Sequence, residues 1–158
     1  MKPAVLFFLC SLTVGAAAQA PKEAMPFRLV IESTDAKPKA GSDIWIKVTL
    51  TNNSMETLDM SGGFSDLTHL DPNYHFEVRS DQGRPVPKRV YPHPELTTGT
   101  PINRTIQPNE TFAEEQRISA LYDMTRPGAY LVQVSRRRSD NPQDGAIKSN
   151  TITIVISK

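Results

Sequence analysis

The chain has 158 residues, with 18 basic and 17 acidic side chains and a formal net charge of +1. A chain this close to neutral lacks the basic face that nucleic-acid binding requires. It also lacks the charge that draws a protein onto an anionic membrane. The length suits one domain with its own hydrophobic core. The composition therefore favours a globular domain whose partners are not nucleic acids.

The N-terminal residues form an apolar run that Lys2 precedes and small residues follow. The run, 4–14, has about 11 residues, whereas a membrane span needs about 20. This pattern predicts a secretory signal peptide. The small residues up to Ala18 suit a signal peptidase, and cleavage two residues later would put Pro21, with its fixed φ, directly after the cut bond. We therefore expect cleavage between Ala18 and Gln19.

The single cysteine, Cys10, lies inside this apolar run rather than after it, which argues against lipid attachment. After cleavage the remaining chain has no cysteine and cannot form a disulfide. An exported protein without disulfides is more typical of a bacterial periplasm or exterior than of an animal secretory route. We expect a secreted or periplasmic bacterial protein with no stable membrane insertion after removal of the signal peptide, residues 1–18.

Strict alternation of apolar and polar residues recurs along the rest of the chain and predicts β-strands. The alternating runs are 27–32, 44–51, 74–79, 130–135 and 151–157. Each run is bounded by Asn, Asp, Gly or Pro, which favour turns for distinct backbone reasons. Thirteen prolines also argue against long helices.

Four other segments are less regular. Residues 111–118 suit a helix or a strand, and we expect an exposed strand because short β segments surround them. Residues 119–123 suit a single helical turn. Residues 55–72 and 84–106 are predicted to be loops, and loops of that length in a compact domain are usually functional or disordered.

About seven short strands separated by turns indicate an all-β fold. The expected architecture is an immunoglobulin-like sandwich of two antiparallel sheets, covering residues 27–158. The segment between the signal peptide and the first strand, 19–26, is predicted to be a flexible tail.

Five stretches taken together resemble a known fold family: 41–53 (GSDIWIKVTLTNN), 76–86 (FEVRSDQGRPV), 106–112 (IQPNETF), 121–124 (LYDM) and 127–132 (PGAYLV). Their order resembles bacterial immunoglobulin-like β-sandwich modules. It is similar to the non-catalytic sandwich domain of deuterolysin-type proteases and to the intracellular proteinase inhibitors of bacilli. Deuterolysin-type proteases bind zinc through His-Glu-x-x-His in a following domain, and this chain has no such motif. The resemblance therefore implies a fold and no protease activity, and it identifies no inhibitory residue.

Two tyrosines near the last third of the chain have two readings. The hydroxyl of Tyr122 or Tyr130 would pin a neighbouring loop, as in the tyrosine corner of immunoglobulin-like sandwiches. Simple packing in the core accounts for either tyrosine equally well, because a buried tyrosine usually finds a local hydrogen-bond partner.

Three histidines and an aspartate are the candidates for a metal site: His69, Asp71, His75 and His93. Their spacing matches no zinc pattern, so we predict no metal and no cofactor. The mature chain has no cysteine nucleophile, and its serines lie in turns without a nucleophile elbow. We therefore predict that the protein is not an enzyme.

The segment 84–96 contains four prolines, which favour a stiff, extended backbone. Tyrosine and arginine are enriched in binding hot spots. We therefore predict that this loop carries the binding residues Arg89, Tyr91, His93 and Glu95. A loop that only covers one open end of the sandwich would fit the same pattern.

These observations favour an exported, non-catalytic immunoglobulin-like module that binds another envelope or extracellular protein through its loops. A proteinase inhibitor that acts through 84–96 is the first alternative. A metal-dependent hydrolase built on the four histidine and aspartate candidates is the second. The three hypotheses therefore predict protein binding, protease inhibition or metal-dependent hydrolysis.

Overall fold

The computed structural model describes residues 25–64, 71, 73–90, 100–137 and 145–158. Within them, eight strands and one 3₁₀ helix follow in chain order: β1 (Phe27–Ser33), β2 (Trp45–Asn52), β3 (Leu58–Phe64), β4 (Tyr74–Ser80), β5 (Thr100–Ile106), β6 (Thr111–Arg117), η2 (Ile118–Ala120), β7 (Gly128–Arg136) and β8 (Ile147–Ile156). No helix in this part of the chain has the length and apolar character needed to cross a membrane.

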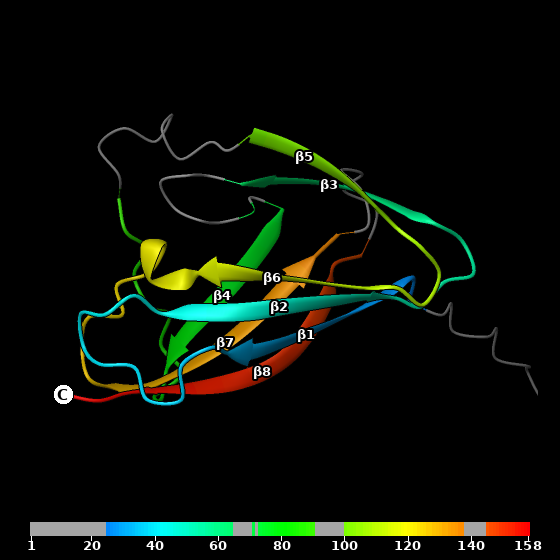
Figure 1. Cartoon of the computed structure of the whole chain (residues 1–158). Coiled ribbons are helices and arrows are strands. Elements are labelled where there is room, and N and C mark those ends of the chain that lie inside the picture. The colour runs from blue at the N-terminus through cyan, green and yellow to red at the C-terminus, as the bar shows by residue number, and fades with distance from the viewer. Residues whose placement is uncertain (1–24, 65–70, 72, 91–99, 138–144) are drawn as a thin grey trace, which may run out of the picture.

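Two three-stranded antiparallel sheets pack face to face, one in the order β1-β2-β6 and the other in the order β4-β7-β8. A separate two-stranded ribbon, β3-β5, lies beyond β6 at the top of the view (Figure 1). The predicted all-β sandwich of two antiparallel sheets is confirmed. The order also matches strands A-B-E and C-F-G of immunoglobulin sandwiches, which describes an architecture and assigns no family.

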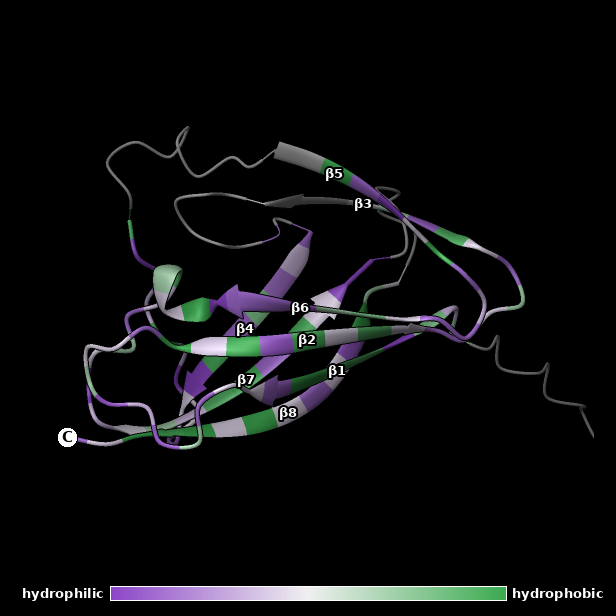
Figure 2. Ribbon diagram, in the orientation of Figure 1, coloured by the Kyte–Doolittle hydropathy of each residue, from purple (hydrophilic) through white to green (hydrophobic). Residues whose placement is uncertain are grey.

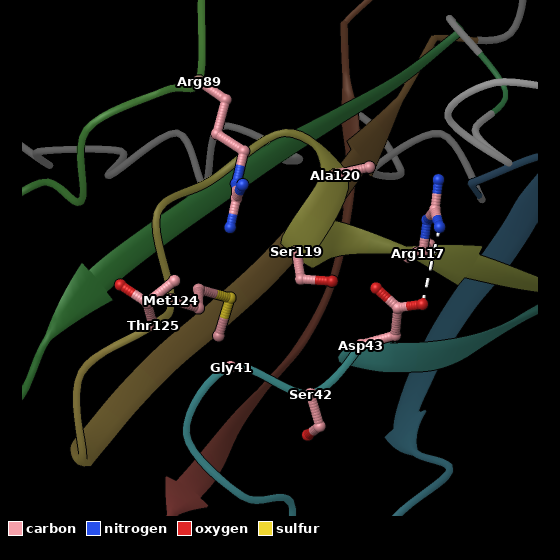
Figure 3. Close-up of a pocket in the computed structure, with 9 residues that line it drawn as sticks. All are labelled: Gly41, Ser42, Asp43, Arg89, Arg117, Ser119, Ala120, Met124 and Thr125. Atoms are coloured by element: carbon pink, nitrogen blue, oxygen red, sulfur yellow. Dashed lines mark hydrogen bonds and ion pairs between the residues drawn. The ribbon is translucent and has the colours of Figure 1, made fainter.

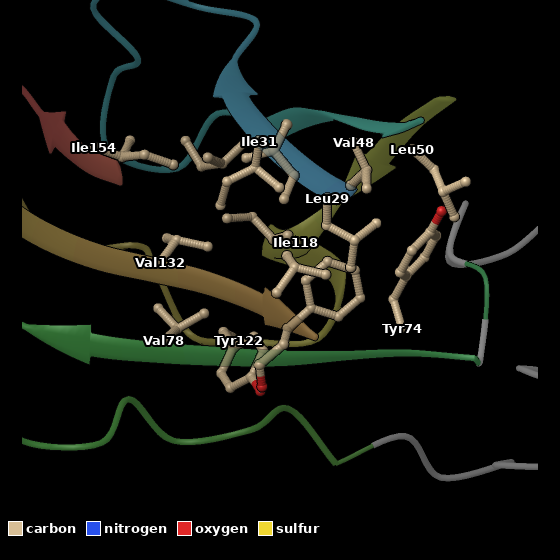
Figure 4. Close-up of a cluster of buried hydrophobic side chains, with 14 of the residues drawn as sticks. Leu29, Ile31, Val48, Leu50, Tyr74, Val78, Ile118, Tyr122, Val132 and Ile154 are labelled. Atoms are coloured by element: carbon tan, nitrogen blue, oxygen red, sulfur yellow. The ribbon is translucent and has the colours of Figure 1, made fainter. Parts of the chain in front are cut away.

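The core lies between the two sheets and follows directly from the alternation in the sequence. Successive side chains of a strand point to opposite faces, and Figure 2 shows hydrophobic and hydrophilic residues alternating along β2 and β8. The antiparallel register places Leu29 opposite Leu50 and Ile31 opposite Val48. These side chains meet those of the facing sheet, such as Val132, in one buried cluster (Figure 4).

The two tyrosines are both buried and both bonded to the backbone, but in different ways. The hydroxyl of Tyr130, near the start of β7, donates to the carbonyl of Arg126 at 2.8 Å, four residues upstream. That is the geometry of a tyrosine corner. The hydroxyl of Tyr122 instead donates to the carbonyl of Phe76 on β4. Tyr130 therefore forms the corner, and Tyr122 ties the segment after η2 to the second sheet.

A bulge in β8 lies beside the side chain that links the two sheets. The β7–β8 register shifts between Gln133 and Ser135, and the amide of Val134 donates to the Ser149 hydroxyl at 3.0 Å instead of to a backbone carbonyl. The side chain of Asn150 then reaches β1, where it accepts from the amide of Ile31 at 2.8 Å and donates to its carbonyl at 3.0 Å. A side-chain amide thus supplies the strand-like pairing between the two sheets.

The sequence prediction was wrong for two segments expected to be loops, because 55–72 contains β3 and 84–106 contains β5. This raises the strand count from about seven to eight. Neither strand gives a strong signal: β3 has two alternating pairs before Gly62-Gly63, and β5 contains Pro101, and both residue types are depleted in strands. Residues 111–118 form a strand over most of their length, as expected. The helical turn predicted at 119–123 corresponds to η2, which spans Ile118–Ala120.

The predicted signal peptide, 1–18, lies outside the described residues. So do residues 19–24 of the predicted tail. Cleavage between Ala18 and Gln19 stays a prediction from the sequence.

Candidate functional site

A polar pocket of about 250 Å³ opens at the end of the sandwich where β2 begins and β6 ends. Figure 3 shows that its walls come from three separate parts of the chain: the β1–β2 connection, the β6–η2 junction with the segment after it, and the proline-rich segment after β4. The lining residues are Gly41, Ser42, Asp43, Arg89, Arg117, Ser119, Ala120, Met124 and Thr125.

The first wall is a tight turn that hydrogen bonds hold on both sides. Gly41 has a φ of +82°, a backbone conformation that glycine adopts without steric cost. The amide and the hydroxyl of Ser42 both donate to the carbonyl of Lys39, at 3.1 and 2.7 Å. The amide of Ala40 donates to the carbonyl of Ser157 at 2.9 Å, which fastens the turn to the end of β8. The position of Asp43 is therefore fixed by the backbone that precedes it.

The second wall carries Ser119, which is 8 % exposed. Its hydroxyl oxygen accepts a hydrogen bond from the amide of Ile44 at 3.0 Å, joining η2 to the start of β2. Because the oxygen is engaged as an acceptor, the hydroxyl proton is left to donate. In Figure 3 this hydroxyl points toward the side of the pocket where Asp43 and Arg117 lie.

Arg117 is the last residue of β6 and lies opposite Trp45 in the β2–β6 register. Its Nη1 is 3.4 Å from Oδ2 of Asp43, and the two side chains are 23 % and 60 % exposed. The guanidinium carbon also lies 5.9 Å from the centre of the Trp45 ring, within the range of a cation–π contact. Arg117 is therefore oriented by an aromatic ring and a long, solvent-exposed ion pair.

Arg89 is held through its backbone. Its amide donates to the carbonyl of Leu121 at 2.7 Å, and the amide of Asp123 donates to the carbonyl of Pro87 at 3.0 Å. The side-chain Nε donates to the carbonyl of Tyr122 at 3.3 Å. The terminal nitrogens of the guanidinium group extend into the pocket (Figure 3).

Charge at the pocket is unbalanced. Two lining side chains are cationic, Arg89 and Arg117, and one is anionic, Asp43. A second carboxylate, Asp123, lies nearby: the hydroxyl of Thr125 donates to it at 2.7 Å, and this bond lowers the pKa of Asp123 below its ordinary value. Asp123 is also within electrostatic reach of Arg89 and Arg126, so the wider site holds three cations and two anions. Cationic side chains therefore outnumber anionic ones at the site by one.

A second charged cluster lies in the interior, under the β3–β5 ribbon. Oδ2 of Asp71 accepts from Nη1 of Arg136 at 2.8 Å, and both side chains are 4 % exposed. Oδ1 of Asp71 accepts from the amide and the side chain of Asn73, at 2.9 and 3.0 Å. Arg136 also donates to the carbonyl of Ser61 on β3, and its guanidinium carbon lies 4.6 Å from the centre of the Tyr74 ring.

Two groups around this buried pair have raised pKa values. Burial raises the pKa of Glu114, although a hydrogen bond from Tyr74 acts in the opposite direction. Burial also raises the pKa of the Tyr74 hydroxyl. The side-chain carbonyl of Gln116 accepts from the amide of Asp71 at 2.8 Å, while its Nε2 has no hydrogen-bond partner among the described residues. The cluster ties β3, β4, β6 and β7 together.

The predicted binding residues are only partly placed. Arg89 lines the pocket, while Tyr91, His93 and Glu95 lie outside the described residues. The sequence reasoning missed Asp43, Arg117 and Ser119. Asp43 stands more than 70 positions before Arg117 and Ser119, and no local pattern marks it as their neighbour.

The two metal candidates that the structure describes, Asp71 and His75, lie in different environments. The Asp71 carboxylate is committed to Arg136 and Asn73 in the interior, and His75 is exposed on β4. No group of three or more metal-binding side chains occurs within the described ranges. His69 and His93 lie outside the described residues, so the structure does not test the four candidates as a set.

Comparison with known proteins assigns no family. No family matches the sequence, and no curated protein matches it. Among solved structures, the structural-genomics target SoR45 shares 8 % identity at a TM-score of 0.41, over 83 % of this chain and 87 % of that one. BslA, described as a bacterial hydrophobin, shares 9 % at 0.41, over 85 % and 97 %.

A third solved structure is a family 123 glycoside hydrolase from Clostridium perfringens, with 12 % identity and a TM-score of 0.34. It aligns with 84 % of this chain, and the chain spans 28 % of the length of that enzyme. At these identities and TM-scores, none of the three likenesses carries an argument about function.

Proposed function

We propose that this chain is an exported, non-catalytic binding module that holds an envelope or extracellular protein at the end of the sandwich bearing the polar pocket. The observation that carries the proposal is the pocket itself, which Arg89 and Arg117 line from two separate segments. Charged and polar side chains presented by loops on a rigid sheet scaffold are the usual means by which sandwich domains bind partners. Arginine is also enriched at the centres of protein interfaces.

The stem of the proline-rich segment supports the same proposal. The amide of Val86 donates to the carbonyl of Val78 on β4 at 3.0 Å, and the amide of Ser80 donates to the carbonyl of Arg84 at 2.8 Å. On its other side the stem is bonded to the segment after η2 through Arg89. The next residue, Val90, is 93 % exposed. A backbone anchored on both sides loses little entropy when it binds a partner.

Site-specific photo-crosslinking tests this proposal. A benzophenone amino acid at Val90 reports on the pocket end, and the same amino acid at Val155, which is 59 % exposed on β8, is the matched control. We expect a discrete crosslinked protein in the envelope or secreted fraction of the source organism for position 90 and none for position 155. Equal crosslinking at both positions, or none at position 90, contradicts the proposal.

The export part of the proposal has its own test. The N-terminus of the protein recovered from the secreted or periplasmic fraction is expected to be Gln19, because cleavage after Ala18 follows the small-residue stretch. Intact-mass spectrometry measures this directly. Recovery of the chain only from the cytoplasm, with the first 18 residues still present, contradicts export.

Proteinase inhibition is the second candidate function, and the anchored stem favours it as well. An inhibitory loop must stay rigid while a protease grips it, and residues 84–90 are held by hydrogen bonds to both β4 and the segment after η2. Replacing 91–96 with a glycine linker leaves this stem intact. If the protein inhibits a protease, the replacement abolishes inhibition without changing thermal stability by more than a few degrees.

A further inference from the structure

We propose that the pocket is a carboxylate-binding site that takes the acidic side chain of an Asp or Glu presented by the protein partner. The inference deepens the proposed function, because only the source of the carboxylate depends on a protein partner being bound. The pocket chemistry itself stands on Arg89, Arg117 and Ser119.

The donors in the pocket suit a carboxylate. An arginine guanidinium is a planar fork of N–H donors that matches the two oxygens of a carboxylate, and such charge-assisted bonds are the stronger class of hydrogen bond. Nε of Arg89 is already bonded to the carbonyl of Tyr122, which fixes the plane of the group and leaves its terminal nitrogens toward the pocket (Figure 3). The Ser119 hydroxyl proton adds a neutral donor to the pocket lining, since its oxygen is engaged by the amide of Ile44.

The charge balance favours a single negative charge. The lining side chains carry two positive charges and one negative charge. In the wider site Asp123 lies within electrostatic reach of both Arg89 and Arg126, and counting Asp123 and Arg126 leaves the same excess of one positive charge. A carboxylate neutralises this excess. A phosphate dianion would leave a net negative charge beside Asp43, where like charges repel. The site is therefore matched to a carboxylate rather than to a phosphate.

The size of the pocket favours one side chain over a whole small molecule. Pockets for drug-sized ligands measure about 300–1,000 Å³, and this pocket measures about 250 Å³. A pocket of this size holds the end of one side chain while the rest of its chain stays outside. That geometry fits a partner that inserts an acidic residue between the turn at Ser42 and the stem at Arg89.

Acetate titration followed by NMR tests the site. Acetate is added to ¹⁵N-labelled protein at constant ionic strength, and the Nε–H signals of Arg89, Arg117 and Arg136 are recorded. We expect saturable shifts at Arg89 and Arg117, none at the buried Arg136, and no response to acetamide, the neutral analogue. Arg89→Gln is expected to weaken acetate binding about tenfold or more, since a hydrogen bond to a charged group is lost.

Two further variants make the result specific. Arg28→Gln removes an exposed cation from β1 and is expected to leave acetate binding unchanged, which excludes a general effect of net charge. Arg89→Lys keeps the charge but loses the planar fork, so its affinity is expected to lie between wild type and Arg89→Gln. Shifts that do not saturate, or equal losses in the Arg28 and Arg89 variants, overturn the proposal.

Three additional probes identify the class of ligand. A short acetylated and amidated peptide with one central Glu is expected to compete with acetate, and its Gln counterpart is not. A peptide whose only carboxylate is its C-terminus is expected to compete less well than the Glu peptide, and the reverse order overturns the assignment to an acidic side chain. Inorganic phosphate above its second pKa is expected to bind more weakly than acetate, and tighter binding overturns the assignment to a carboxylate.

This test fails independently of the proposed function. Acetate binding that is lost in Arg89→Gln, combined with no crosslinking at Val90, means that the carboxylate site exists and the protein partner does not. Crosslinking at Val90 without acetate binding means that the partner is held by other contacts.

Discussion

The described part of the molecule contains two arginine–aspartate pairs in opposite situations. Arg136 and Asp71 are 2.8 Å apart and both 4 % exposed, whereas Arg117 and Asp43 are 3.4 Å apart and lie at the surface. In the interior pair the two charges face each other at hydrogen-bond distance, although Nε of Arg136 has no hydrogen-bond partner among the described residues. At the pocket, Arg89 is a second lining cation, and the carboxylate within its electrostatic reach, Asp123, lies outside the lining. The same residue types therefore hold the fold together in one region and offer a site to a ligand in the other.

β6 contributes to both regions through consecutive residues. Gln116 points inward and accepts from the amide of Asp71, and Arg117 points the other way, toward Asp43. Alternation along a strand accounts for this division. One strand can thus serve a buried network and a surface site without either interfering with the other.

The largest predicted difference between the regions is the effect of the same substitution on stability. Arg136→Met leaves the Asp71 carboxylate buried without its partner and is expected to cost about 3–5 kcal/mol. Arg117→Met removes a long pair whose aspartate is exposed and whose arginine is partly exposed, and it is expected to cost about 1 kcal/mol. Urea unfolding of both variants measures the difference. Similar losses for the two would show that the regions do not differ as described.

A second substitution tests the frame of the pocket, meaning the hydrogen bond that joins η2 to the start of β2, separately from its charged side chains. Ser119→Ala leaves the amide of Ile44 buried without an acceptor and is expected to cost about 1–3 kcal/mol. The control is Ser42→Ala, which removes an exposed hydroxyl that donates to Lys39 and is expected to change stability by about 0.5 kcal/mol or less. Denaturant unfolding that ranks Ser42→Ala as the more damaging change contradicts this account of the frame.

The smallest predicted effect concerns pH and sharpens the description of the buried cluster. Burial raises the pKa of Glu114 above its ordinary value of 4.5. Its contribution to stability is therefore fully present below about pH 4.5 and is lost as the pH rises through the raised pKa of the folded state. Glu114→Gln is expected to flatten this part of the stability curve. An unchanged curve would show that Glu114 is not the group responsible.

The strands of the two main sheets could be predicted because their alternation is set by one buried face, as at Ile46, Val48 and Leu50. The β3–β5 ribbon could not, because its pairing depends on residues far apart, such as Leu58 and Ile106, and its glycines and proline disfavour strands locally. Alternation reports burial against a core. In β3 and β5 the alternation is too brief to predict a strand, although Leu58, Met60 and Ile106 are buried.

The candidate site could also be predicted only where a local sequence pattern marked it. Arg89 was predicted because prolines surround it in the sequence, which is a local signal. Arg117 and Ser119 become neighbours of Asp43 only when β2 and β6 pair. Asp71 was only a candidate metal ligand, because histidines flank it, and its partner, Arg136, lies 65 positions away. Charges that meet through tertiary structure leave no mark in a single sequence.

Chemical modification of the arginines tests the contrast between the two regions most directly. Phenylglyoxal labels accessible guanidinium groups, and peptide mass spectrometry follows the rate at each site. We predict that Arg89 reacts fast and is protected by acetate, while Arg136 reacts only as fast as the sandwich opens. Equal rates at Arg89 and Arg136, or a rate at Arg89 that acetate leaves unchanged, would contradict the assignment of one arginine to the fold and the other to a ligand.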